Sequence, residues 1–426
     1  MEIKDIYSKF LECSSVCTDT RSITPNSLFI ALKGEKFDAN SFAQEALNKG
    51  AKYAIIDNSA YQIKNKTLLV NNSLETLQEL ANFHRKKLQT KLVALTGSNG
   101  KTTTKELINA VLSTKYNTIA TIGNLNNHIG VPLTLLRLTT ETEIGIIEMG
   151  ANHQKEIEFL CNIAQPDFGY ITNFGKAHLE GFGGTEGVIK GKSELITYLK
   201  ENNKLVFVNS DDPIQKEKTK DLNIFSFSKS DKANIEIKEV TANPMVKITL
   251  TDTTIESNLI GFYNATNISA AIAIGKYFDI EDKEIKKAIE NYHPNNNRSQ
   301  ILEKSSNKII LDAYNANPSS MEVALLNFNQ LKEQNKIAIL GDMFELGDES
   351  YNEHKKIVLS QENNKETNFY FIGKEFYKNK KNNNNFHFFE DFESFKKEIT
   401  NKKIQNSFLL IKGSRGMALE RTLEIL

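Results

Sequence analysis

The stretch Lys91–Lys105 (KLVALTGSNGKTTTK) contains the residues of this chain whose types and spacing point most directly to chemistry. Four apolar residues, Leu92–Leu95, predict a buried parallel strand, followed by a glycine turn and a helical pattern. This order is typical of loops that bind a triphosphate, because backbone N–H groups in a glycine turn can approach phosphate oxygens. Lys101 would then contact the β- and γ-phosphates, and Thr102 would offer its hydroxyl to Mg²⁺.

This loop is shorter than the common P-loop. The common loop has four residues between its first glycine and the Gly-Lys pair, whereas two residues separate Gly97 from Gly100 here. A chance glycine turn before a helix is the alternative, but the flanking strand and helix favour a nucleotide loop. The predicted nucleotide contacts are Gly97, Ser98, Asn99, Gly100, Lys101, Thr102 and Thr103.

Two further residues follow apolar strands. Glu148 ends the predicted strand Gly145–Glu148, and His178 follows the predicted strand Asp167–Ile171. Ligands collect at the carboxyl ends of parallel strands, so we expect Glu148 to bind Mg²⁺ and His178 to face the same site. An ordinary strand-end acid is the alternative for Glu148. A hydrogen-bonded loop histidine is the favoured interpretation of His178 from this context alone, although a neutral imidazole can bind a metal.

Other polar residues are less specific. Lys190 and Lys192 lie in a predicted helix, Thr185–Lys200, whose charges are typical of a solvated face. The segment Asp312–Met321 follows another apolar strand and suits either polar ligand recognition or a plain turn. Arg298 could place a positive charge near a transferred phosphoryl group, or it could be a surface arginine.

Composition excludes several classes of protein. The chain has 426 residues, with 53 Lys plus Arg and 53 Asp plus Glu, so it has no basic excess that would indicate nucleic-acid binding. Its three cysteines are expected to be free thiols. The N-terminal stretch MEIKDIYSKFLE is not typical of a signal peptide, and no apolar run approaches the roughly 18 residues of a membrane span. We expect a soluble cytoplasmic protein without an integral membrane segment.

The order of predicted elements indicates an α/β protein of three domains. Residues 1–87 predict a small α/β domain, and residues 88–295 alternate strand and helix as in a doubly wound, mostly parallel sheet. Alternating residues at about 233–260 predict a small side sheet. Pro and Asn residues at 293–298 mark a boundary, and residues 296–426 repeat the strand–helix order as a third, Rossmann-like α/β domain.

The motifs TGSNGKTTTK, GIIEMG, NFGKAHLEGF, GFYNATNISAAIA and DAYNANPSSM, in this order, resemble those of the bacterial Mur ligases. The resemblance covers essentially the full chain. GDMFELG at 341–347 and IKGSRGMALE at 411–420 are similar to C-terminal signatures of the family, and TDTRSITPNSLFIALKGEKFDAN resembles a uridine-nucleotide domain.

This resemblance implies roles for residues that match the family motifs. It implies ATP, bound with help from Asn264, Asn267, Arg298 and Asp312, and two Mg²⁺ ions, bound by Thr102, Glu148, His178 and Lys192. Lys101, His178 and Lys192 would be catalytic, and Lys192 would be carbamylated, although Lys190 lies only two residues away. Implied substrate contacts are Thr20, Arg21, Lys33, Asp38, Asn126, Asn127, His128, Asn315, Asn317, Ser414 and Arg415.

The same resemblance implies an activity. The chain lacks the Asp-Asn-Pro-Arg motif usual in the ligase that adds the third peptide residue, which favours the member that adds D-Ala-D-Ala to UDP-MurNAc-tripeptide. Asp38-Ala39-Asn40 departs from a more usual Asp-Gly-His run, which bears on the uridine contacts. We expect a monomer with a hinge at Asn291–Arg298. The alternatives are a folylpolyglutamate synthase, a P-loop regulatory module and an inactive scaffold.

Overall fold

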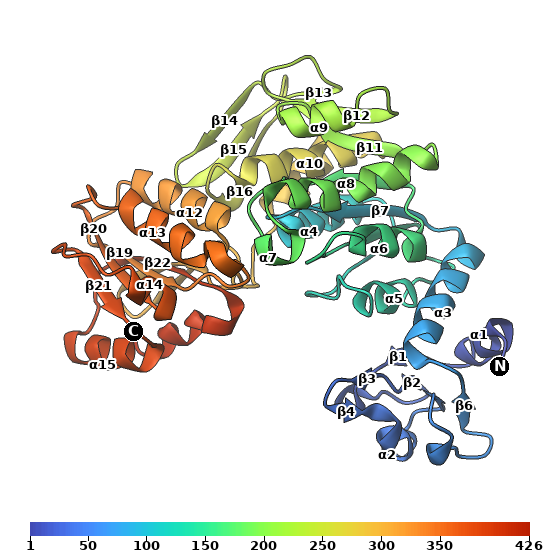
Figure 1. Cartoon of the computed structure of the whole chain (residues 1–426). Helices are drawn as coiled ribbons and strands as arrows, with labels where there is room; N and C mark the ends of the chain where they lie inside the picture. Colours follow the sequence, from blue (N-terminus) through green and yellow to red (C-terminus); the bar gives the residue numbers. More distant parts are fainter.

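The computed structural model describes residues 1–426 and contains three α/β bodies arranged along an open arc (Figure 1). The N-terminal body (blue) and the C-terminal body (orange to red) lie at the two ends of this arc, and the central body lies between them. The predicted α/β class, with a mostly parallel central sheet, is confirmed. None of the helices combines the length and apolar character that crossing a bilayer requires.

The N-terminal body is built on a four-stranded parallel sheet of order β1-β2-β5-β6. Its strands are β1 (Val16–Cys17), β2 (Leu28–Ile30), β5 (Tyr53–Ile56) and β6 (Thr67–Leu69), with a hairpin of β3 (Lys33–Gly34) and β4 (Phe37–Asp38) beside them. Helices α1 (Ile3–Phe10) and α2 (Ala43–Asn48) complete it. Cys13, Cys17 and Cys161 are free cysteines.

Helix α3 (Ser73–Leu88) leads from the N-terminal body into the central one. It begins at Asn72, whose side chain accepts hydrogen bonds from the backbone N–H groups of Leu74 (2.9 Å) and Glu75 (3.1 Å). Such a cap satisfies N–H groups that lack helical partners. At the other end, Arg85 donates to Ala164 O (3.1 Å) and pairs with Asp167 (2.8 Å), so α3 is fixed to the central body.

The central body has a seven-stranded parallel sheet of order β13-β12-β11-β10-β7-β9-β8. Its strands are β7 (Lys91–Thr96), β8 (Thr118–Ala120), β9 (Ile144–Glu148), β10 (Phe168–Ile171), β11 (Leu205–Asn209), β12 (Ile224–Ser228) and β13 (Ile235–Glu236). β7 lies between β9 and β10, and its side chains from Leu92 to Thr96 are buried. Burial on both faces explains its near-continuous apolar sequence.

Helices cover both faces of this sheet. One apolar cluster contains α4 (Lys101–Leu112), α10 (Asn264–Tyr277) and α11 (Asp282–Glu290), and another contains α5 (Gly130–Leu135), α6 (Glu156–Ala164) and α8 (Thr185–Glu201). The short helices α7 (Leu179–Phe182) and α9 (Pro213–Lys218) follow β10 and β11. The predicted side sheet is present as antiparallel β14 (Glu239–Ala242), β15 (Met245–Thr249) and β16 (Thr254–Ile260).

The C-terminal body has a six-stranded sheet of order β17-β18-β22-β19-β20-β21, in which only the β17–β18 pair is antiparallel. Its strands are β17 (Gln300–Lys304), β18 (Asn307–Asp312), β19 (Lys336–Gly341), β20 (Thr367–Ile372), β21 (Phe386–Phe389) and β22 (Phe408–Lys412). Helices α12 (Pro318–Gln330), α13 (Ser350–Ser360) and α14 (Lys374–Lys378) pack on one face, and α15 (Phe392–Lys402) packs on the other.

The predicted strands Leu92–Leu95, Gly145–Glu148 and Asp167–Ile171 match β7, β9 and β10 to within one residue at each end, whereas the edge strands β8 and β21 were not predicted. β8 and β21 each form an edge of a sheet and are three and four residues long, so their sequences carry little periodicity. Helix α6 begins at Glu156, directly after Lys155, which has a left-handed conformation (φ 74°). Ile235–Glu236 joins the central sheet rather than the side sheet.

The attachment of α3 gives a stability prediction. Arg85→Met would leave Asp167 and two backbone carbonyls without their buried cationic donor, and we expect a loss of about 3 kcal/mol in unfolding free energy. Lys204→Met removes a half-exposed partner of the same carboxylate (2.7 Å) and should cost less than about 1 kcal/mol. Urea unfolding followed by circular dichroism measures both; equal losses would contradict the assignment of Arg85 as the anchor.

Candidate active site

The glycine loop between β7 and α4 has the backbone conformation that a phosphate site needs. Gly97 has φ +142° and Gly100 has φ +78°, values that favour glycine. A Cβ atom at Gly100 would lie 2.6 Å from Oδ1 of Asn267, so this position has no room for a side chain. No side chain caps the N-terminus of α4, so its first N–H groups are available to an anion.

Residues that follow β10 hold this loop. The carbonyl oxygen of Asn99 accepts hydrogen bonds from Thr172 Oγ1 (2.6 Å) and Asn173 Nδ2 (3.0 Å), and Ser98 Oγ donates to Gly175 O (2.7 Å). The loop is therefore fixed by the neighbouring strand end before any ligand binds. A preformed cradle costs less conformational entropy when it binds.

The Lys101 ammonium group lies inside the loop. Its Nζ donates to the carbonyl oxygens of Gly97 (2.8 Å) and Ser98 (3.3 Å). Burial lowers the pKa of Lys101, and the nearby charge of Arg298 lowers this pKa further, while Glu148 raises it. A phosphate group would offer this ammonium a stronger acceptor than the two carbonyls do.

Glu148 has the environment of a magnesium ligand. It is 1% exposed at the end of β9, where its Oε1 accepts from Asn126 Nδ2 (2.8 Å) and Thr102 Oγ1 (3.3 Å). Its Oε2 is buried and has no hydrogen-bond partner. A buried carboxylate oxygen without a partner, beside a threonine hydroxyl, fits the oxygen ligands that Mg²⁺ prefers.

His178 is placed at the same end of the sheet, in the loop before α7, and it lines the central cavity. Its Nδ1 contacts Oε2 of Glu345, which belongs to the C-terminal body. No group of three or more His, Cys, Asp and Glu side chains clusters in a way that could hold a metal ion. A second metal would therefore need ligands beyond these side chains, such as phosphate oxygens or water.

Lys192 does not belong to a solvated face, so that interpretation of its helix is wrong at this position. Lys192 is 1% exposed, whereas Lys190, on the same helix, is exposed. The Lys192 Nζ donates to Ala151 O (3.1 Å) and lies 4.9 Å from the centroid of the Phe182 ring. Burial, followed by the charge of Lys101, holds the pKa of Lys192 well below its usual range.

A single cavity of about 1610 Å³ joins the central and C-terminal bodies. It brings together most of the predicted site residues: Ser98, Asn99, Gly100, Lys101, Thr102, Thr103, Asn126, Asn127, His128, Glu148, His178, Asn264, Asn267, Arg298, Asp312, Asn315, Asn317 and Arg415. Gly97, Lys192 and Ser414 do not line it, nor do Thr20, Arg21, Lys33 and Asp38. A cavity of this size exceeds that of ordinary small-molecule sites.

The two asparagines of α10 form hydrogen bonds with other residues of the protein. Asn267 Oδ1 accepts from Thr104 Oγ1 (3.0 Å), and its Nδ2 donates to Asn264 Oδ1 (2.8 Å). Both asparagines are buried, so these bonds tie α10 to α4 directly behind the glycine loop. Their amides are occupied, and they shape the nucleotide loop from behind.

Two charged residues of the C-terminal body face the cavity. The Arg298 guanidinium carbon lies 3.7 Å from the centroid of the Tyr314 ring, and its buried Nε has no hydrogen-bond partner. Asp312 accepts from Lys412 Nζ (2.6 Å) and from the N–H of Ser299 (3.0 Å). Arg298 is thus held by stacking, with donor capacity left for an anion.

The C-terminal body is docked directly on the glycine loop. Asn99 Oδ1 accepts from Asn317 Nδ2 (2.8 Å), and Asn99 Nδ2 donates to Ser319 Oγ (2.9 Å). Asn317 also caps α12 in a reciprocal arrangement with Ser320. Lys176 and Glu353 form a second bridge between the bodies (3.2 Å). The sequence analysis gave no role to Glu345 or Lys176, although the motifs GDMFELG and NFGKAHLEGF contain them, and Glu353 lies outside the motifs that it considered.

The predicted muramyl contacts lie beside Glu148 and α5. Asn126 donates to Glu148 Oε1, Asn127 Oδ1 accepts from the N–H groups of Ile129 (3.1 Å) and Gly130 (2.9 Å), and His128 O accepts from Gln78 Nε2 (3.0 Å). The last bond joins the loop to α3. These residues extend the cavity from the glycine loop toward the N-terminal body.

The predicted uridine contacts form a separate polar group in the N-terminal body. Asp38 Oδ1 accepts from Asn40 Nδ2 (2.6 Å), which also donates to Asp57 Oδ1 (2.7 Å), and Lys33 pairs with Asp57 (2.9 Å). Asn40 therefore has a structural role in joining these two carboxylates. Arg21 pairs with Asp19 (2.6 Å), and Thr20 O accepts from Lys49 Nζ (3.1 Å).

The crowding at Gly100 gives a second prediction. Gly100→Ala places a methyl group against Asn267, so we expect the affinity for a fluorescent ATP analogue to fall at least about tenfold. Gly123→Ala is the matched control, because Gly123 also has a positive φ (+54°) but open space around its Cβ. Fluorescence titration measures both affinities, and thermal unfolding checks that both variants fold. Unchanged affinity in Gly100→Ala would contradict a nucleotide loop here.

Comparisons with known proteins agree with this geometry. The family model "Mur ligase family, catalytic domain" matches residues 12–85, "Mur ligase middle domain" matches 95–275, and "Mur ligase, glutamate ligase domain" matches 297–415. The chain is 34% identical to the UDP-N-acetylmuramoyl-tripeptide–D-alanyl-D-alanine ligase of Bacillus subtilis, over 95% of this chain and 91% of that protein. It is 38% identical to the ligase of the same name from Escherichia coli, over 79% and 76%.

Solved structures show the same similarity. A crystal structure of MurF from Acinetobacter baumannii superimposes with a TM-score of 0.87 and 29% identity, over 99% of this chain and 97% of that one. MurF from Thermotoga maritima, in complex with ADP, gives a TM-score of 0.84 and 27% identity, over 98% and 97%. With family models in all three bodies and relatives of this similarity along most of its length, the chain belongs to the Mur ligase family.

Proposed function

We propose that this chain is an ATP-dependent ligase that adds D-Ala-D-Ala to UDP-MurNAc-tripeptide and forms UDP-MurNAc-pentapeptide, a precursor of peptidoglycan. The observation that carries the proposal is the cavity in which the glycine loop, Glu148 and the polar residues of the C-terminal body meet. The names of its relatives from Bacillus subtilis and Escherichia coli supply the substrates.

The chemistry of amide formation explains why such a site needs ATP. A carboxylate is a poor acyl donor because its leaving group would be an oxide ion. Transfer of the γ-phosphoryl group of ATP to a carboxylate oxygen forms an acyl phosphate and releases ADP. The amine of the dipeptide then attacks the acyl carbon, the C–O bond to phosphate breaks, and phosphate and one proton leave. This route depends on positioning and charge neutralisation rather than on a nucleophilic side chain.

The residues of the glycine loop match these demands. The free N–H groups of α4 and the Lys101 ammonium would hold the phosphates, and Arg298 would face the transferred group. Thr102 and Glu148 would hold Mg²⁺, which supplies positive charge between the carboxylate and the triphosphate. Docking of the C-terminal body, through Asn99 and Asn317, would keep water from the acyl phosphate.

The three bodies would divide the substrates. We assign the uridine nucleotide to residues 1–87, ATP to residues 88–295 and the dipeptide to residues 296–426, with movement about Asn291–Arg298. The dipeptide would contact three residues that line the cavity, Asn315, Asn317 and Arg415. Ser414 would hold this segment in place, because its hydroxyl donates to Ala316 O. One chain forms the whole cavity, which supports a monomer as the working unit. We propose the cytoplasm as its location.

We also propose that Lys192 is carbamylated. Burial lowers the pKa of its amine well below the usual range, so the neutral form, which can attack CO₂, is favoured relative to that of an exposed lysine. In this reaction the amine nitrogen forms a bond to the CO₂ carbon, a C–O π bond becomes an oxygen lone pair, and one proton leaves to water. The resulting anion would balance the charge of Lys101 and would be a further oxygen ligand for a second Mg²⁺ with His178.

A phosphate-release assay tests the ligase directly. With Mg·ATP and UDP-MurNAc-tripeptide, we expect phosphate release only when D-Ala-D-Ala is added, together with the mass of the pentapeptide product. L-Glutamate and an amine-free reaction are the controls. Lys101→Ala should reduce the rate at least about 100-fold. Release with a folate substrate instead would support a folylpolyglutamate synthase, and amine-independent hydrolysis would support a regulatory module.

Carbamylation can be measured without turnover. With ¹³C-bicarbonate, the wild-type chain should show a carbamate ¹³C resonance that Lys192→Arg lacks. Lys190→Arg is the matched control, because this exposed lysine lies two residues away on the same helix, and it should keep the resonance. Loss of the resonance in Lys190→Arg but not in Lys192→Arg would move the modification to Lys190. A wild-type spectrum without the resonance would contradict the modification.

A further inference from the structure

We propose that Glu345, which belongs to the C-terminal body, is a positioning residue that fixes the tautomer of His178 in the central body. The site at His178 is then complete only while these two bodies are docked. The contribution of this pair to catalysis rests on the proposed ligase function, whereas the tautomer itself does not.

The contact between the two side chains determines where the imidazole proton sits. Oε2 of Glu345 contacts Nδ1 of His178. Nδ1 is buried and forms no hydrogen bond of regular geometry, so the Glu345 carboxylate is the polar group that it faces. An ionised carboxylate only accepts hydrogen bonds, which places the proton of a neutral His178 on Nδ1. The lone pair then lies on Nε2, and His178 lines the cavity. A carboxylate behind a histidine prepares the opposite nitrogen to bind a ligand in this way.

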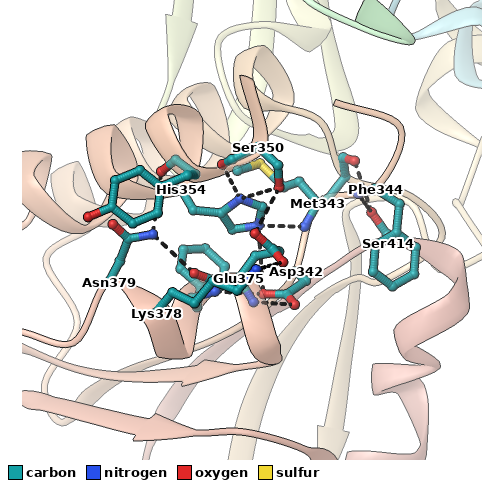
Figure 2. A network of polar contacts seen from close by, with 12 residues as sticks. Asp342, Met343, Phe344, Ser350, His354, Glu375, Lys378, Asn379 and Ser414 are labelled. Atoms are coloured by element: carbon teal, nitrogen blue, oxygen red, sulfur yellow. Dashed lines mark hydrogen bonds and ion pairs between the residues drawn. The ribbon is translucent and has the colours of Figure 1, made fainter. Parts of the chain in front are cut away.

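Glu345 lies in the loop between β19 and α13, and the stem of this loop is anchored (Figure 2). Asp342, the first residue after β19, is 4% exposed and accepts hydrogen bonds from the N–H groups of Glu375 (2.9 Å) and Phe376 (2.9 Å). Its own N–H donates to Ile372 O (3.1 Å). Gly373 faces this carboxylate and leaves no room for a Cβ atom.

The next two residues of the stem are also held. The Met343 N–H donates to Nε2 of His354 (3.0 Å), whose Nδ1 donates to Ser350 O (2.7 Å). Nε2 accepts from an N–H group, so it carries no proton, and burial lowers the pKa of His354, which favours the same neutral imidazole. The Phe344 N–H donates to Ser414 Oγ (2.9 Å). Figure 2 shows both contacts. Glu345 therefore extends from three consecutive anchored residues.

His178, the partner of Glu345, does not take part in the hydrogen bonds that hold the stem of the loop. His178 follows β10, and its backbone begins α7, whereas Glu345 reaches it only from the other body. Thr102 and Glu148 both belong to the central body and keep their contact whether or not the bodies are docked. Separation of the bodies would therefore release His178, whereas Thr102 and Glu148 would keep their contact. The contact between Glu345 and His178 therefore couples the state of His178 to docking of the C-terminal body.

Histidine NMR of the full chain tests the proposal. In the ¹⁵N-histidine-labelled protein, at about pH 8 where an ordinary imidazole is neutral, His178 is assigned by the signal missing from His178→Gln. We expect the wild type to show the Nδ1–H tautomer. Glu345→Ala should lose that signature, and Glu345→Gln should retain it at least in part, because its amide oxygen can still accept. An unchanged His178 spectrum in Glu345→Ala would overturn the proposal.

Glu353→Gln is the matched control for docking. Glu353 also bridges the two bodies, through Lys176, but it does not contact His178. Its variant should keep the Nδ1–H signature. If Glu353→Gln changes His178 as much as Glu345→Ala does, the cause is docking in general, and the specific role of Glu345 is overturned.

The stem network is tested with two variants of His354. His354→Gln can place an amide oxygen where Nε2 accepts from Met343, whereas His354→Asn is too short to do so. We expect only His354→Asn to shift the His178 tautomer. If both variants keep it, the network does not position Glu345. Phosphate release should fall about 10- to 100-fold in Glu345→Ala. A wild type that shows the tautomer but no ligase activity would contradict the proposed function alone.

Discussion

The structure depends on the hydrogen bonds that hold Asn99 in the glycine loop. Its backbone oxygen is bound by two residues that follow β10, and its side-chain amide is bound by the residues that begin α12. One loop residue thus joins the central sheet to the C-terminal body at the point where phosphates are expected. A loop with its glycines in left-handed conformations would otherwise have many alternative states, and each fixed contact lowers the entropy that a ligand must overcome.

Positive charge is concentrated at the same part of the structure. The chain has no net charge, yet Lys101, Arg298 and Lys412 gather around one cavity. Burying cations costs free energy unless anions compensate them. Asp312 compensates Lys412, while the carbonyls that receive Lys101 offer only partial charges. The cavity therefore carries positive charge that a polyanionic substrate can neutralise. This charge favours the binding of such a substrate.

The sequence predicts the parts of this molecule that depend on local pattern. The apolar runs of β7, β9 and β18 identify buried parallel strands, and the glycine loop between β7 and α4 predicts a phosphate site. Edge strands such as β8 were missed because pairing with β9, rather than their own periodicity, makes them strands. Lys192 was misassigned to a solvated face, because its burial comes from Phe182 and Ala151. Glu345 could not be paired with His178, because they lie on different bodies and 167 positions apart (345 − 178).

Helix α3 has a consequence for the whole assembly. It is one uninterrupted helix of 16 residues, about 24 Å long at 1.5 Å per residue, capped at one end by Asn72 and bound to the central body at the other by Arg85. An α-helix resists both bending and stretching. Helix α3 therefore keeps the N-terminal body at a fixed distance from the glycine loop. A molecule that binds at both ends of this span is selected by its length as well as by its chemical groups. Any gain or loss of a residue along such a substrate would displace its reacting end from the loop.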